Sequence, residues 1–264
     1  MATIAPQPFA PSTSDEPFFL RSAIAMTFVF VAGFSFQLAM GRSTFASPLR
    51  VHVHAMLFMG WVALYLMQNV LVATGRIGLH RRLGWIAAGW MVAMTVSGIV
   101  VTVMVVRNGT TPFFFQPLQF LVFDPIAVLT FAGLTTAAIL LRRQTDWHRR
   151  LHFCGITMLL GPAFGRLLPL PLLQPWSWEA TFAVTLLFPL WGMWSDVKRS
   201  GRVHPAWAWG IATILASFVL VQAITYGPAG TVVYNWTTDG SRGAAIAPLE
   251  FQPAEGRLMT GRSQ

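Results

Sequence analysis

Three histidines lie in two short basic segments of this chain that repeat each other. His80 opens the sequence His-Arg-Arg-Leu, and His148 opens the same four residues later in the chain. His152 follows His148 by four residues, so both side chains lie on one face if that segment is helical. Imidazole is a common metal ligand, and arginine pairs well with carboxylates. One interpretation is therefore a haem iron held between His80 and His148 or His152, with Arg81 and Arg149 at the haem propionates.

The alternative is that these basic segments lie at a membrane surface. Clusters of arginine at the ends of membrane helices are common, and they contact anionic lipid headgroups. On this interpretation Arg81 and Arg149 bind lipid, and the histidines lie among the headgroups without a cofactor. The sequence favours the lipid interpretation, because interfacial basic clusters are ordinary features of membrane proteins.

A second set of ionisable residues lies within long apolar runs. His54, Asp124 and Arg166 each fall near one end of such a run. Charged groups at membrane depth are costly, and they usually bind each other or serve a function. One interpretation is an ion pair of Asp124 with Arg166 or His54 that holds helices together. The other is a substrate or quinone site, because an imidazole titrates near neutral pH and can exchange a proton with a quinone head.

The helices of a membrane protein must position these residues, because the amino-acid composition favours no other class of protein. The 264 residues have a mean hydropathy of +0.58, and only 10% are charged, whereas soluble domains carry roughly a quarter. A net charge of +9 would suggest a nucleic-acid partner in a soluble protein. Here the basic residues flank apolar runs, so the charge indicates topology and lipid contact, and we expect no nucleic acid. The single cysteine, Cys154, excludes an internal disulfide and a cysteine-based metal cluster.

Seven apolar runs have the length of a membrane span, which is about 20 residues. The predicted spans are residues 20–40, 50–73, 84–106, 117–141, 150–170, 178–196 and 205–226. The expected fold class is thus all-α, a polytopic bundle of about seven transmembrane helices within residues 18–226. Residues 1–17 are expected to be a disordered tail, and residues 227–264 a polar tail.

Lysine and arginine are concentrated in alternate loops, which predicts an orientation. Ten of them fall in the second, fourth and sixth loops, and four fall in the first, third and fifth. Because cytoplasmic loops carry the excess, we expect a bacterial inner (cytoplasmic) membrane protein with a cytoplasmic N-terminus and its C-terminal tail outside.

The repeated His-Arg-Arg-Leu segments also suggest an internal duplication. Each follows one predicted span and opens the next, so spans two and three and spans four and five would form two parallel two-helix repeats. Together they predict a four-helix core over residues 50–170, with His80 and His148 at related positions.

Two resemblances extend this interpretation. Leu79-His80-Arg81-Arg82-Leu83-Gly84 and His148-Arg149-Arg150-Leu151 resemble a group of uncharacterised bacterial multi-pass membrane proteins with paired LHRRLG and HRRxM turns. Members of that group have an arginine about one span after the second turn, and Arg166 matches it. His152 stands where that group usually has methionine. More distantly, the four-helix core is similar to the transmembrane cytochrome b superfamily of ascorbate- and ferric-reducing proteins, which hold two haems between histidine pairs. That resemblance leaves room here for one haem b and not for two, because the other face lacks a partner histidine.

Three classes of function fit these residues. The first, which we rank first, is an accessory or binding subunit, with membrane lipids, a quinone or another membrane subunit as its partner. For an accessory subunit we expect a stable partner and no deep polar cavity. The second is a single-haem b-type membrane electron-transfer protein that interacts with quinone. The third is a small-solute or proton-linked transporter, for which we expect a cavity that reaches Asp124 and Arg166. No catalytic motif stands out, so the sequence leaves open whether the protein is an enzyme.

Overall fold

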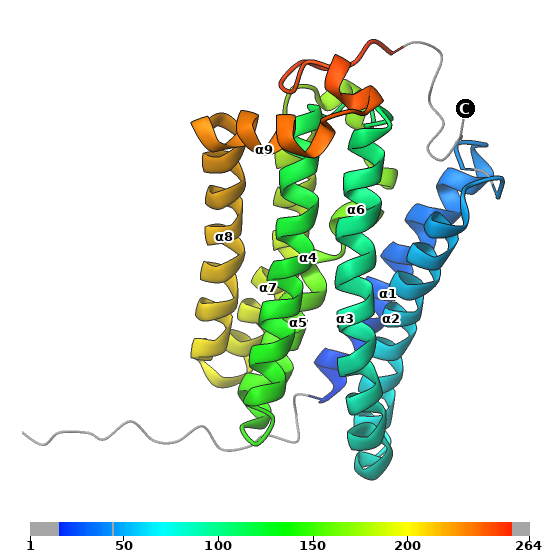
Figure 1. Ribbon diagram of the computed structural model, residues 1–264. Helices are drawn as coiled ribbons and strands as arrows, with labels where there is room; N and C mark the ends of the chain where they lie inside the picture. Colours follow the sequence, from blue (N-terminus) through cyan, green and yellow to red (C-terminus); the bar gives the residue numbers. More distant parts are fainter. Residues whose placement is uncertain (1–15, 44, 255–264) are drawn as a thin grey trace, which may run out of the picture.

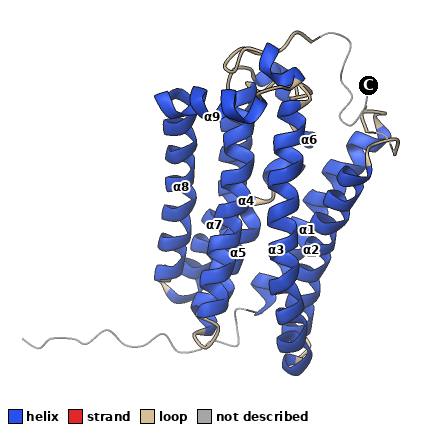
Figure 2. Cartoon of the chain, viewed as in Figure 1, coloured by secondary structure: helices blue, strands red, loops and turns tan. Residues whose placement is uncertain are grey.

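The computed structural model describes residues 16–43 and 45–254, and it is built from helices (Figures 1 and 2). The α-helices are α1 (Glu16–Ala39), α2 (Leu49–Ala73), α3 (Ile77–Arg107), α4 (Pro117–Leu140), α5 (Thr145–Met158), α6 (Gly161–Leu167), α7 (Ser177–Ser200), α8 (Pro205–Tyr226) and α9 (Pro228–Thr238). Two short 3-10 helices are η2 (Leu170–Leu173) and η3 (Arg242–Ala245). The described residues form no strand, which confirms the expected all-α class.

Five of these helices are long and apolar enough to cross a membrane. They are α1, α2, α3, α4 and α8, and each exceeds the roughly 20 residues that the hydrocarbon requires. Large apolar side chains point outward from them, as Phe28 does with 71% of its surface exposed. An exposed apolar surface of this extent is suited to lipid rather than to water. These features are those of an integral membrane protein.

Two of the seven predicted spans do not form a single apolar helix. The fifth is divided into α5 and α6, because the N–H groups of Leu159 and Leu160 bond to carbonyls three residues back rather than four. Pro162 follows at the start of α6, where its missing N–H costs least. The sixth, α7, is long but carries Glu179 and Asp196, and it is not among the five apolar helices. The seven-span topology therefore stays a prediction.

Both histidine-bearing segments lie in the first turns of helices, although the sequence suggested basic turns between helices. α3 begins at Ile77 and so includes His80. The chain reverses just before it at Gly75, whose φ of +71° is a conformation that favours glycine. α5 begins at Thr145, with Asp146 in its first turn, where a negative charge interacts favourably with the helix dipole. The histidines therefore extend from rigid helices.

The helices pack largely in chain order. α2 packs on α3, α3 on α4 and α4 on α5, while α1 packs on α2 and α6, and α8 packs on α4 and α5. α1 and α6 approach closely, because a Cβ on Gly33 would lie 2.5 Å from the Ala163 carbonyl oxygen. The core between the helices is aromatic, with Phe131, Phe153 and Trp207 fully buried. The two expected two-helix repeats, α2 with α3 and α4 with α5, are thus adjacent. A symmetry relation between them stays a prediction.

The segment expected to be a polar tail is folded as far as residue 254. Its helix α9 lies against the ends of α3, α4 and α8 (Figure 1). Tyr234 is buried, and its hydroxyl hydrogen-bonds the Gly243 carbonyl at 3.1 Å. The Leu118 N–H donates to the Pro248 carbonyl at 2.8 Å, so this segment also caps the start of α4. Residues 255–264 and nearly all of the predicted N-terminal tail lie outside the described residues.

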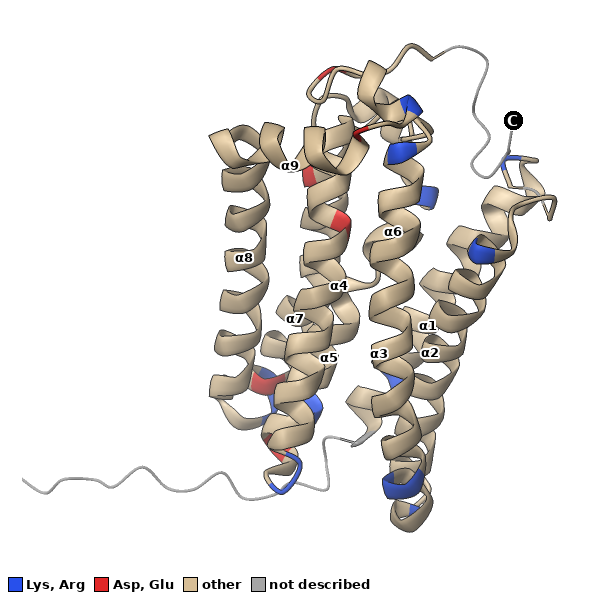
Figure 3. Ribbon diagram, in the orientation of Figure 1, with Lys and Arg blue, Asp and Glu red and all other residues tan. Residues whose placement is uncertain are grey.

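Charged residues lie mostly toward the two ends of the bundle, as the coloured ribbon of Figure 3 shows. We call the end that holds His80, His148 and Asp196 the histidine end. The half that holds Asp124, Arg166 and α9 is called the cavity end. Which of the two ends faces the cytoplasm stays a prediction.

Candidate functional site

The three candidate haem ligands meet at the histidine end. The ring centroids of His80 and His148 are 6.2 Å apart, and those of His148 and His152 are 4.8 Å apart, both pairs edge to face. His80 comes from α3 and the other two from α5, so the two repeated segments contact each other. What such a cluster can bind depends on which ring nitrogens are free.

Hydrogen bonds give His80 and His148 opposite tautomers when both rings are neutral. His148 Nδ1 lies 2.8 Å from the Ala138 carbonyl, so Nδ1 carries the proton and Nε2 keeps a lone pair. The Gln68 amide is satisfied when its oxygen accepts from the Gly84 N–H at 3.0 Å and its nitrogen donates to His80 Nδ1 at 2.6 Å. His80 Nε2 is then protonated, whereas an iron held between the two rings would need a lone pair from each.

The contacts of the histidine cluster decide neither for haem binding nor for lipid binding, so both interpretations stay predictions. No group of three or more histidine, cysteine, aspartate or glutamate side chains in the described ranges is arranged to hold a metal ion. Arg149 pairs with Asp146, and its guanidinium lies 5.1 Å from the centroid of the Phe19 ring. Arg149 is thus engaged within the protein, while Arg81 is exposed at the start of α3.

A buried charge network beside these histidines was missed by the sequence analysis. Arg150 and Asp196 are only 1% and 3% exposed. Arg150 donates twice to the carboxylate, through Nη2 at 2.7 Å and through Nε at 3.0 Å. Trp207 Nε1 donates to the same carboxylate at 2.9 Å, and the His204 N–H does so at 3.2 Å. This network joins α5 to α7 and to the start of α8, and its donors satisfy both oxygens of the carboxylate.

A cavity of about 1720 Å³ opens at the other end of the bundle. Its walls come from helices α1 to α8, with further residues from the loop after α3 and from the C-terminal segment. Ligand pockets for drug-sized molecules measure about 300–1,000 Å³. The space is therefore large enough for a molecule of lipid size.

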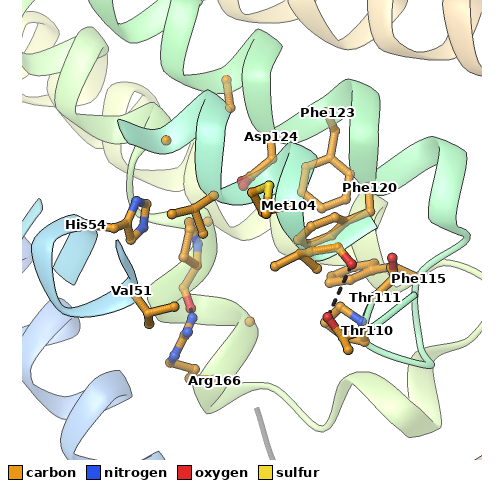
Figure 4. Close-up of a pocket in the computed structure, with 18 of the residues that line it drawn as sticks. Val51, His54, Met104, Thr110, Thr111, Phe115, Phe120, Phe123, Asp124 and Arg166 are labelled. Atoms are coloured by element: carbon orange, nitrogen blue, oxygen red, sulfur yellow. Dashed lines mark hydrogen bonds between the residues drawn. The ribbon is translucent and has the colours of Figure 1, made fainter. Parts of the chain in front are cut away.

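His54, Asp124 and Arg166, which the sequence analysis grouped together, all line this cavity (Figure 4). The Asp124 carboxylate accepts from the Thr102 hydroxyl at 2.6 Å. Arg166 Nη1 donates to the Pro162 carbonyl at 2.7 Å, and its guanidinium lies 4.1 Å from the centroid of the Phe34 ring. No ion pair joins Asp124 to Arg166 or to His54 in the described part of the chain. The contacts therefore do not support the interpretation as a structural ion pair.

Several polar atoms in the cavity wall are buried without a partner. They are Gln37 Oε1, His54 Nδ1, Thr111 Oγ1 and Arg166 Nε. Roughly 90% or more of buried polar groups in proteins are hydrogen-bonded, so a cluster of exceptions needs an explanation. A polar group of a molecule inside the cavity could satisfy them.

The rest of the wall is largely aromatic. Figure 4 shows Phe115, Phe120 and Phe123 facing the cavity across from His54 and Arg166. These rings also contact one another, since the Phe115 and Phe123 centroids are 5.2 Å apart. The cavity thus combines a polar side with an apolar side, which matches a molecule that has a polar head and an apolar body.

No known protein family, curated protein or solved structure matches this chain. The site must therefore be interpreted from its own contacts. Its histidine, carboxyl and guanidinium groups can bind and orient a polar head, and its phenylalanines can exclude water from an apolar body.

Proposed function

We propose that this protein binds an amphipathic small molecule in the cavity at its cavity end. The observation that carries the proposal is a single cavity that combines unpartnered polar atoms with a phenylalanine wall. Buried polar atoms without partners cost about 1–3 kcal/mol each. A ligand that satisfied them while covering the phenylalanines would recover that free energy and add about 25 cal/mol for each Å² of apolar surface removed from water.

This proposal is a binding function, and it departs from the accessory class as the sequence framed it, because that class expects no deep polar cavity. A cavity that reaches Asp124 and Arg166 is the feature expected of the transporter class. A quinone, with its ring carbonyls and isoprenoid tail, is one molecule of the required kind, and a lipid is another. Transport of a small solute would require the same cavity and, in addition, release toward the histidine end. Electron transfer would require haem at the histidine cluster, and it stays a separate prediction.

A cavity-filling substitution tests the proposal against a matched control on the same helix. Ala127 lines the cavity, whereas Leu129 is 52% exposed on the outer surface of α4. In Ala127→Phe the larger ring should occupy ligand space and weaken binding about tenfold or more. Leu129→Phe should bind as the unmodified protein does.

The measurement is mass spectrometry of small molecules that co-purify with the three proteins in mild detergent. We expect one class of amphipathic molecule at a fixed ratio to the unmodified protein and to Leu129→Phe, and its depletion from Ala127→Phe. Equal recovery from all three proteins, or no bound molecule in the unmodified protein, would contradict the proposal.

A further inference from the structure

Positively charged side chains outnumber negatively charged ones in the cavity lining. Among the described lining residues, five are arginines and one is an aspartate. The arginines are Arg42, Arg50, Arg107, Arg166 and Arg242, and the aspartate is Asp124. A cleft lined by one sign of charge raises the local concentration of molecules with the opposite sign. The lining is therefore complementary to a negatively charged ligand.

Arg166 is the arginine best placed to bind the head of such a ligand. Its guanidinium is oriented by the Phe34 ring on one side and by the Pro162 carbonyl at Nη1, while Nε is buried without a partner. A guanidinium presents its N–H groups as a planar fork that matches the two oxygens of a carboxylate or phosphate. Arg107, by contrast, already donates to the Thr237 carbonyl.

Asp124 lies in the same cavity as Arg166 but forms no direct ion pair with it. Its carboxylate accepts from the Thr102 hydroxyl, and among the described residues no ion pair connects it with Arg166. A charge held in an apolar surrounding is costly when no opposite charge makes direct contact with it. An anionic group on the ligand would offset that cost at Arg166.

We propose that the ligand is an anionic amphiphile whose carboxylate or phosphate head binds Arg166. Its apolar body lies against Phe115, Phe120 and Phe123 on the opposite wall. This inference rests on the proposed function, and it adds the charge of the head. A free fatty acid and a phosphate-bearing lipid share this chemistry, so the test includes both.

The test measures binding of radiolabelled laurate to the protein in nanodiscs of zwitterionic phosphatidylcholine, with empty nanodiscs as background. Three further ligands are compared with laurate. Dodecanol has the same chain length and an uncharged head, dodecyl phosphate has a phosphate head in place of the carboxylate, and decylubiquinone has a neutral ring. We expect laurate or dodecyl phosphate to bind about tenfold or more tightly than dodecanol, a difference of about 1.4 kcal/mol.

Variants at Arg166 connect that preference to one side chain. Arg166→Gln should bind laurate and dodecanol equally, and Arg166→Lys should keep part of the preference because it retains the charge without the planar fork. Arg143→Gln is the matched control, since Arg143 is exposed at the histidine end, and it should bind as the unmodified protein does.

The outcomes separate this inference from the proposed function. Equal binding of laurate and dodecanol by the unmodified protein, or stronger binding of decylubiquinone, would overturn the anionic head and leave the proposed function standing. Failure of every probe to bind, together with no effect of Ala127→Phe on co-purifying molecules, would overturn both. If Arg166→Gln still preferred laurate over dodecanol, the anionic head would bind at a residue other than Arg166, which would contradict the inference.

Discussion

The two ends of this bundle use similar polar residues in opposite ways. At the histidine end the Asp196 carboxylate is enclosed by Arg150, Trp207 and the His204 backbone, and it joins three helices. At the cavity end Asp124 has the Thr102 hydroxyl as its partner, while Arg166 keeps a buried nitrogen without one. The difference suggests how to distinguish the two roles of a charged residue in such a bundle: one that its neighbours leave unsatisfied is a candidate for binding a ligand. When its neighbours satisfy it fully, it holds the fold together.

The largest expected effect comes from removing the carboxylate at the histidine end. Asp196→Ala would remove the carboxylate that accepts from Arg150 Nη2, Arg150 Nε and Trp207 Nε1. Breaking a buried ion pair typically costs about 3–5 kcal/mol, and the Asp146 carboxylate, 3.3 Å from Arg150 Nη1, should offset part of that cost. We expect a marked fall in the thermal unfolding temperature of the purified protein in detergent. Asp239→Ala, at an exposed aspartate, is the control. Equal unfolding temperatures for the two variants would mean that the network does not stabilise the fold.

The corresponding change at the cavity end should alter binding rather than stability. In Asp124→Asn the amide oxygen can still accept from the Thr102 hydroxyl, so unfolding should change by less than about 1 kcal/mol. Removal of the one negative charge in the lining should tighten laurate binding by about two- to tenfold. A large loss of stability in this variant would show that Asp124 is a structural residue, and the contrast between the two ends would then fail.

Acidification should weaken the histidine end through His204. Burial lowers the pKa of His204 below its ordinary value of 6.5, and the nearby Arg150 lowers it further. The unfolded chain therefore binds a proton at pH values where the folded chain does not, so this contribution to stability is present above pH 6.5 and is lost as the pH falls below it. Protonation would also break the bond from the Ala206 N–H to His204 Nδ1 that caps α8, and an N-cap bond contributes about 1 kcal/mol.

Unfolding temperatures measured from about pH 8 to about pH 5 test this dependence. His204→Asn is the matched variant, because asparagine can form the cap and does not titrate in this range. We expect its unfolding temperature to fall less with acidification than that of the unmodified protein. Identical slopes would assign the pH dependence to other groups.

The smallest expected effect is at the histidine cluster itself. When the Gln68 amide takes the orientation that satisfies both of its ends, Gln68 and the Ala138 carbonyl give the two rings opposite tautomers. In that arrangement we expect no sharp haem α-band in a reduced-minus-oxidised spectrum, even when haem is supplied during expression. A band at about one haem per chain that disappears in His148→Ala would establish the haem alternative. Both ends of the bundle would then bind ligands.

The sequence predicted the helices better than it predicted their polar contacts. Apolar runs identified every region that forms a long helix, because burial in lipid demands that pattern. The sequence also grouped His54, Asp124 and Arg166, because ionisable residues in apolar runs are rare enough to stand out. Their roles remain proposals.

Contacts that depend on helix packing were beyond the sequence. Arg150 was interpreted together with the surface arginines, because nothing in its local sequence shows that α7 and α8 cover it and bring Asp196 against it. Thr102 was not considered, since a hydroxyl in a membrane helix usually bonds within its own helix. The fold of the C-terminal segment was also missed, because α9 is too short to show a span-length apolar run.

The break between α5 and α6 has a geometric consequence. Arg150 belongs to α5 and is fixed to the Asp196 network, whereas Arg166 belongs to α6, a separate piece of seven residues. A continuous helix would fix the direction of Arg166 relative to Arg150, but the tightened turn at Leu159 and Leu160 separates the two helices. The position of Arg166 in the cavity wall is therefore set by how α6 packs on α1, whereas the position of Arg150 is set by the Asp196 network.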